Sequence, residues 1–151
     1  MALSLDDIHE LEIRQEYPAA IDALEELVRS DPSDAEAVIR LGFNLWYVVA
    51  EAERLQASLP TQHYASRFME LFRQHRDALA DNPDFCWAFG QGMNMFWWAF
   101  PGATEQLGKS LIDTACRLDG FWSRFWTDLT EAEGAGRLRG RGILQRYYNV
   151  R

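Results

Sequence analysis

The chain contains few of the residues from which catalytic and metal centres are built. Its three histidines, His9, His63 and His75, are scattered through 151 residues. It has no His-Glu-x-x-His motif, no paired-cysteine metal motif and no Gly-x-Ser-x-Gly turn. His9 with Glu12 or Glu16 could touch a metal along a helix face, but a glutamate-rich surface helix produces that spacing by chance. We therefore expect no enzyme activity, no metal site and no cofactor.

Cysteine is scarce, and long apolar runs are missing. Cys86 and Cys116 each lie among apolar neighbours, as expected of small buried thiols in a reducing cytosol. The alternative is a disulfide, which distances would decide. The first seven residues lack the basic and apolar regions of a signal peptide. The longest aromatic cluster ends at Pro101, and no run approaches eighteen apolar residues. These features predict a cytoplasmic protein without a membrane span.

Charge of one sign dominates, but unevenly. The chain has a net charge of −8, which argues against nucleic acid as the main partner and favours a basic one. Residues 1–36 hold eleven acidic residues and two arginines, a net charge of −9, whereas residues 137–151 hold five arginines and no acid. Charge runs usually form solvated surfaces, so solvated helix faces followed by an arginine-rich tail are the simplest interpretation.

Helix signals occur along most of the chain, and no segment alternates apolar and polar residues long enough to predict a strand. Ser4 predicts the cap of the first helix, Ser33 to Glu36 a capping box, and Thr61 a further cap. The turn residues Asp31-Pro32 and Asn82-Pro83 separate neighbouring helices. The expected helices span approximately residues 5–16, 18–30, 34–57, 61–80, 84–99, 103–118 and 121–133.

One stretch, residues 17–42, has a recognisable order of motifs. Its first helix carries small residues, the turn Asp31-Pro32 follows, and Leu41-Gly42 places a small residue in the next helix. This order resembles the tetratricopeptide repeat, whose paired helices carry small residues, Asp-Pro and Leu-Gly at this spacing. The resemblance implies a right-handed array of antiparallel helix pairs, a superhelix that binds other proteins.

Later copies of the motif are less regular. Turn-ending positions recur at Pro32, Pro83 and Gly120, 51 and 37 residues apart, against 34 in the family. Twelve residues before each turn lie Ala20, Leu71 and Gly108; of these, Leu71 departs from the small residue that the repeat prefers. We expect an all-α, tetratricopeptide-like domain of about seven helices over residues 1–133. An Arg/Gly-rich tail would occupy residues 134–151, and its last part, 143–151, would be a short helix or an extended docking arm.

Two stripes of side chains are candidates for a partner-binding groove. Each stripe shares one helix face at spacings of i, i+4, i+7 and i+11. The stripes consist of Arg40, Asn44, Tyr47 and Glu51, and of Trp87, Gln91, Asn94 and Trp98. Tryptophan rings would anchor a peptide while amides pair with its backbone. Burial of the tryptophans in the core is the competing interpretation.

Other aromatic positions are expected to be structural. Phe89, Met93, Phe96 and Phe100 face the core. A stripe near the end of the array would form a cap over its exposed apolar end. It consists of Phe121, Trp122, Phe125 and Trp126.

Two other functions use the charged regions. An acidic inhibitor, such as the immunity protein of a bacterial toxin or nuclease, would cover a basic active site with acidic residues. These are Asp6, Asp7, Glu10, Glu12, Asp22, Glu25 and Glu26. Alternatively, the tail could bind single-stranded nucleic acid through its arginines and tyrosines. The tail residues are Arg137, Arg139, Arg141, Arg146, Tyr147 and Tyr148. We favour docking of the tail on the acidic part of the protein, within one chain or in a homodimer, over binding of nucleic acid.

Overall fold

The computed structural model describes residues 2–55 and 58–124, and over these residues it is all-helical. The expected helix beyond position 124, the cap residues Phe125 and Trp126, and the tail 134–151 lie outside the described residues. The helical elements are α1 (Leu5–Ile13), α2 (Tyr17–Ser30), α3 (Ala35–Ala50), α4 (Ala52–Leu55), α5 (Thr61–His75), α6 (Pro83–Phe96), the 3-10 turn η1 (Trp97–Ala99), α7 (Glu105–Leu118) and α8 (Gly120–Arg124).

Side-chain caps explain where several helices begin. Ser4 and Asp7 form a reciprocal capping box at the start of α1, as expected from the sequence. The side chains of Asn82 and Thr104 accept backbone N–H groups at the starts of α6 and α7. These caps satisfy donors that have no partner within their own helix.

Two predicted caps are wrong. The cap of α3 is Asp34, which accepts the amide of Ala37 at 3.1 Å, while the Ser33 hydroxyl donates to Asp31. Ser33 therefore stabilises the turn before the helix. Thr61 is the first residue of α5, and its cap position is Pro60, which makes no side-chain capping bond.

Several helices end earlier than the periodicity predicted. α1 stops at Ile13 because Gln15 adopts a left-handed conformation, with φ of 62°. The helix expected over 34–57 is divided, with Glu51 as the C-cap of α3 and the short α4 after it. The helix expected over 84–99 leaves regular geometry after Phe96 and tightens into η1. The apolar pattern continues across both breaks, so hydrophobic periodicity alone did not reveal them.

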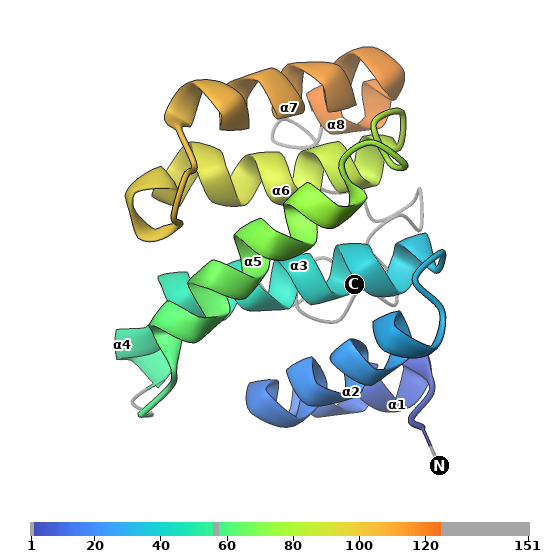
Figure 1. Cartoon of the computed structure of the whole chain (residues 1–151), viewed down its shortest axis with the longest axis vertical. Coiled ribbons are helices and arrows are strands. Elements are labelled where there is room, and N and C mark those ends of the chain that lie inside the picture. The colour runs from blue at the N-terminus through green and yellow to red at the C-terminus, as the bar shows by residue number, and fades with distance from the viewer. Residues whose placement is uncertain (1, 56–57, 125–151) are drawn as a thin grey trace.

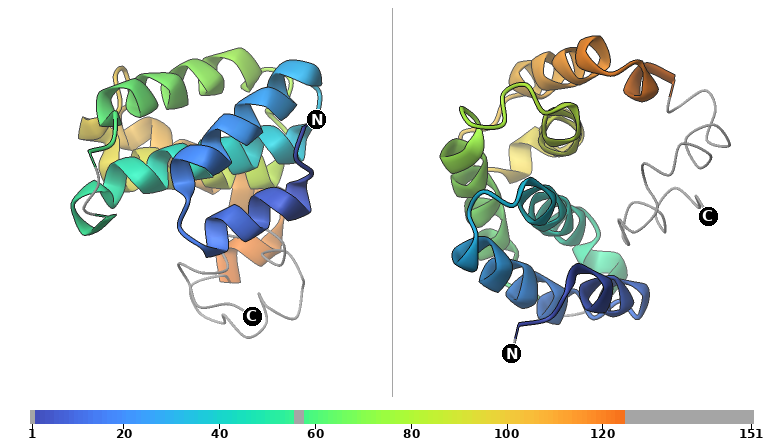
Figure 2. Two further views of the ribbon diagram at one scale, coloured as in Figure 1. Left: turned by 90° about the horizontal axis from the view of Figure 1, so that it is seen from below. Right: turned by 90° about the vertical axis from the view of Figure 1, so that its right-hand side faces the viewer.

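The helices follow an arc (Figures 1 and 2). Figure 1 shows the order along the long axis: α1 and α2, then α3 and α5, then α6 and α7. In the right-hand view of Figure 2, α2 and α5 lie toward the outer side of the arc, and α3 and α6 lie nearer its inner side. α3 contacts α2, α5 and α6, and therefore stands at the centre of the packing. We call the surface of α3 and α6 that carries the two predicted stripes the inner face.

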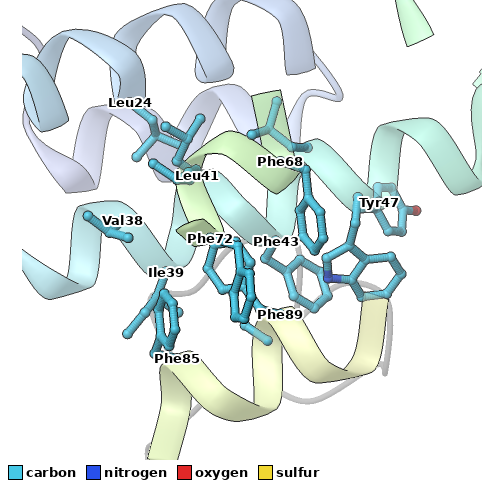
Figure 3. Close-up of a cluster of buried hydrophobic side chains, with 14 of the residues drawn as sticks. Leu24, Val38, Ile39, Leu41, Phe43, Tyr47, Phe68, Phe72, Phe85 and Phe89 are labelled. Atoms are coloured by element: carbon cyan, nitrogen blue, oxygen red, sulfur yellow. The ribbon is translucent and has the colours of Figure 1, made fainter. Parts of the chain in front are cut away.

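The core is built from aliphatic side chains near α2 and from aromatic rings between α3, α5 and α6 (Figure 3). Leu24 and Leu41 are fully buried at the first end. At the second end, Phe68 lies 4.5 Å from Phe100 between ring centroids, and Phe85 lies 4.6 Å from Phe89. Close aromatic pairs of this kind contribute stability beyond the area that they bury. The core therefore continues from one helix pair into the next.

Glycine sets the distance between helices at two of these contacts. A Cβ atom on Gly42 would overlap the Phe89 ring, so α3 and α6 approach closely at that point. A Cβ atom on Gly108 would overlap the backbone of Asn94, so α7 lies directly against the backbone of α6. The small residues at these two positions thus fix the spacing of three helices.

The inner face of α3 and α6

The structure places the two predicted stripes on neighbouring helices that run in the same direction. Gly42 of α3 packs against Phe89 of α6, and further along Trp46 lies 5.9 Å from Phe96 between ring centroids. The N-terminal halves of α3 and α6 therefore lie side by side, as do their C-terminal halves. The break after Phe96 alters one stripe, because Trp98 is carried by η1 and leaves the regular helical row of α6.

α1 covers the N-terminal half of the α3 stripe through a buried polar cluster. Glu12 is fully buried, and its two carboxylate oxygens accept separate hydrogen bonds. Arg40 donates to Oε1 from Nη2 at 2.6 Å, and Asn44 donates to Oε2 from Nδ2, also at 2.6 Å. Asn44 Nδ2 also donates to the Arg40 carbonyl oxygen at 2.8 Å, which fixes the direction of the amide. This half of the stripe binds an acidic side chain of the same chain.

The polar cluster is incompletely hydrogen-bonded. Arg40 Nε, Asn44 Oδ1 and His9 Nδ1 are buried and have no hydrogen-bond partner among the residues that the structure describes. His9 Nδ1 lies 4.0 Å from Glu12 Oε1, which is beyond hydrogen-bond distance. Buried polar atoms are usually paired, and each unpaired one destabilises a fold by about 1–3 kcal/mol. The cluster therefore has hydrogen-bonding capacity that α1 does not use.

α8 covers the N-terminal end of the α6 stripe with aromatic rings. Trp87 and Trp122 stack with centroids 4.3 Å apart and an interplanar angle of 11°. Trp122 Nε1 also donates to Asp84 Oδ1 at 2.9 Å. The Phe43 ring lies nearly parallel to that of Trp87, with centroids 6.3 Å apart. Trp87 is 1% exposed. Phe121 and Trp122 of the predicted cap are both buried, with Trp122 against α6.

The C-terminal end of the inner face is more open. Trp98 is 66% exposed and Trp97 42% exposed, while Asn94 and Glu51 are half-buried. Tyr47 and Gln91 are buried, with Tyr47 packed edge-on against Tyr17 at 5.6 Å. The eight residues of the predicted groove thus divide into five buried side chains and three that reach the surface.

The residues of the alternative acidic interface also divide by environment. Two of them form ion pairs within the fold: Glu12 with Arg40, and Glu25 with Arg67, whose Nε donates at 2.8 Å. The other five are exposed: Asp6, Asp7, Glu10, Asp22 and Glu26. Hydrogen bonds from the Ser4 amide and hydroxyl lower the pKa of Asp7, so this carboxylate is charged down to acidic pH.

A groove between α2 and α5 was not anticipated. It has a volume of about 650 Å³ and is lined by residues of both helices, with Leu45 of α3 among them. Asp22 and Glu25 contribute from α2, and Arg67 and Gln74 from α5. The sequence of each helix has an ordinary amphipathic pattern. Such a pattern does not predict a groove, because a groove depends on how two helices are placed relative to each other.

The thiols are placed as small structural residues. Cys86 and Cys116 are both free. Burial, with a further contribution from Asp81, raises the pKa of the Cys86 thiol, and burial, with Asp113, raises that of Cys116. Both thiols are therefore protonated and weakly nucleophilic at neutral pH. Over residues 2–55 and 58–124 no group of histidine, cysteine and acidic side chains is arranged to hold a metal, and no helix is long and apolar enough to cross a bilayer.

Comparisons of the chain with protein-family models, with curated proteins and with solved structures find no match.

Proposed function

We propose that the chain is a non-catalytic module of tetratricopeptide-like helix pairs that binds a peptide or protein partner on its inner face. The observation that carries this proposal is Trp98, an indole ring 66% exposed in η1, directly after the C-terminal end of α6. Tryptophan is among the residues that contribute most to protein interfaces, because its large ring leaves water when a partner binds. The neighbouring Trp97 and the half-buried Asn94 supply further apolar area and an amide.

The packing of the helices supports the same proposal. The Leu41-Gly42 motif puts its glycine at the contact between α3 and α6, where a small residue allows close approach. The turn at Asp31-Pro32 separates α2 from α3, and Asn82-Pro83 starts α6. These features accord with paired helices that expose one extended face, the arrangement that repeat proteins use for binding.

A peptide selection tests the proposal. A library of random peptides would be selected on the immobilised full chain, and the affinities of enriched peptides measured by fluorescence anisotropy. We expect the substitution Trp98→Ala to weaken binding at least tenfold, about 1.4 kcal/mol, and Asn94→Ala to weaken it less.

The matched control is Leu118→Ala, which removes an exposed apolar side chain (42% exposed) from α7. It should leave the affinity unchanged. Selected peptides that bind equally well to the Trp98 and Asn94 variants would place binding elsewhere and refute the proposal.

A second candidate function, inhibition of a basic protein, is favoured by the five exposed carboxylates of α1 and α2. Long-range attraction between opposite charges accelerates association and is screened by salt. A partner bound through Asp6, Glu10 and Asp22 should associate several-fold more slowly when the salt concentration rises from 0.05 to about 0.5 M. Binding at Trp98 should depend only weakly on salt, so this measurement separates the two functions.

A further inference from the structure

α3 carries both donors of a carboxylate-binding site. Arg40 Nη2 and Asn44 Nδ2 each donate to a different oxygen of Glu12, both at 2.6 Å. Bonds to an ionised carboxylate are short and strong, and two donors fix the orientation of the group. Arg40 and Asn44 are one helical turn apart, so both donors lie on one face of α3, and the acid comes from a separate helix.

We propose that Arg40 and Asn44 form a recognition site for a glutamate carried on a helix, and that α1 occupies this site in cis. An acidic helix of a partner, with an aliphatic residue in the place of Ile8 and a glutamate in the place of Glu12, displaces α1. The inference rests on the proposed function, because it treats the inner face as a binding surface, and it adds the chemistry of the partner.

α1 is short. Of its nine residues Ile8 and Glu12 are fully buried, and Leu5 and Leu11 are half-buried against the core. A helix of this length is not stable alone in water. It is joined to α2 through Gln15, whose φ of 62° is unfavourable for a residue with a side chain. Detaching α1 from α3 therefore costs less free energy than detaching one of the longer helices from the fold.

The cis contact also leaves part of the site unused. Arg40 Nε and Asn44 Oδ1 are more than nine-tenths buried and have no partner among the described residues. A partner that offers an acceptor to the first atom and a donor to the second makes bonds that Glu12 does not make. These bonds add to the affinity of such a partner, which displaces α1 once the gain exceeds the advantage that α1 has from belonging to the same chain.

The probe for this proposal is a synthetic peptide with the sequence of residues 2–16, labelled with a fluorophore. Its target is the full chain with Ile8→Ala and Glu12→Gln, in which the cis contact is weakened. We expect the peptide to bind this variant at least tenfold more tightly than it binds the wild-type chain. A peptide with glutamine at position 12 should bind at least tenfold more weakly than the parent peptide, and adding Asn44→Leu to the target should have a similar effect.

A second measurement uses the wild-type chain and so does not depend on the folding of a variant. Unlabelled peptide is added to the ¹⁵N-labelled protein up to about 5 mM, a concentration at which it competes with the linked α1, and NMR spectra are recorded. We expect the Asn44 side-chain amide signal to shift and the α1 backbone signals to move toward unfolded positions, with no change for the glutamine peptide.

If a variant that circular dichroism shows to be folded does not bind the peptide, or binds both peptides equally, the cluster is only a structural ion pair and the proposal fails. Unchanged NMR spectra at peptide excess lead to the same conclusion. Neither result affects binding of selected peptides at Trp98, so failure here is distinguishable from failure of the proposed function.

Discussion

α1 and α8 cover equivalent parts of α3 and α6 by opposite physical means. α1 brings a charged carboxylate to Arg40 and Asn44, whereas α8 stacks Trp122 on Trp87. A buried ion pair stabilises a fold only while both partners are present, since each charge alone is costly to bury. A stacked pair of rings stabilises roughly in proportion to the area that leaves water. The same helical spacing therefore produces two kinds of contact. The contact of α1 stabilises the fold only while both charges are present, whereas that of α8 stabilises it according to the size of the buried rings.

Removing the aromatic ring should have the largest effect on stability. Trp122→Ala removes a ring that is 2% exposed, together with its hydrogen bond to Asp84. We expect the free energy of unfolding to fall by about 3–5 kcal/mol, as for other buried tryptophans. Urea unfolding followed by circular dichroism measures this change. The double variant with Trp87→Ala should be less stable than either single variant, and a double variant as stable as Trp122→Ala would contradict a size-dependent contact.

Removing one partner of the polar contact should lower the free energy of unfolding slightly less than removing Trp122. Arg40→Leu removes the guanidinium that pairs with the buried Glu12, and we expect a loss of about 3 kcal/mol, the low end for broken buried pairs, because Asn44 still donates to the carboxylate. The double variant with Glu12→Leu should regain part of this loss, because no charge remains buried. Additive losses in this double-mutant cycle would show that the two residues act independently.

The smallest effect should come from the cap of α1 and should depend on pH. Since the Ser4 hydrogen bonds lower the folded-state pKa of Asp7 below 3.8, this group stabilises the fold above that pH, and the contribution is lost as the pH falls through the folded-state pKa. Asp7→Asn should therefore lower the thermal midpoint slightly at pH 7 and much less at pH 2.5. An equal difference between variant and wild type at both pH values would rule out this role for the carboxylate.

Local chemistry made part of this structure predictable. The capping box at Ser4 follows from the preferences of single residues and is present, and Asn82 caps α6 with Pro83 as the first residue of that helix. Helical spacing correctly put Arg40 and Asn44 on one face. Their partner, Glu12, lies 28 and 32 residues earlier in the sequence, and no local pattern distinguishes it from the other acids of its helix. The burial of Glu12 depends on tertiary packing, which the sequence pattern of α1 does not contain.

The open end of the inner face was harder to predict for a different reason. Trp87 and Trp98 have the same residue type and equivalent spacing, yet one is buried and the other exposed. The difference comes from the end of α6 at Phe96 and from the position of α8 over Trp87. Both depend on how the chain packs after it leaves the helix, which helical periodicity does not describe.

The glycine contact between α6 and α7 affects the conformational entropy that is lost when a partner binds. Because Gly108 lies against the backbone of Asn94, the two helices cannot slide or separate without exposing both backbones. We expect their central amides to exchange with deuterium slowly and as a single cooperative unit, while those of α1 exchange early. Asn94 is therefore carried by a backbone segment that α7 holds in place, so little conformational entropy is lost when a ligand orders it.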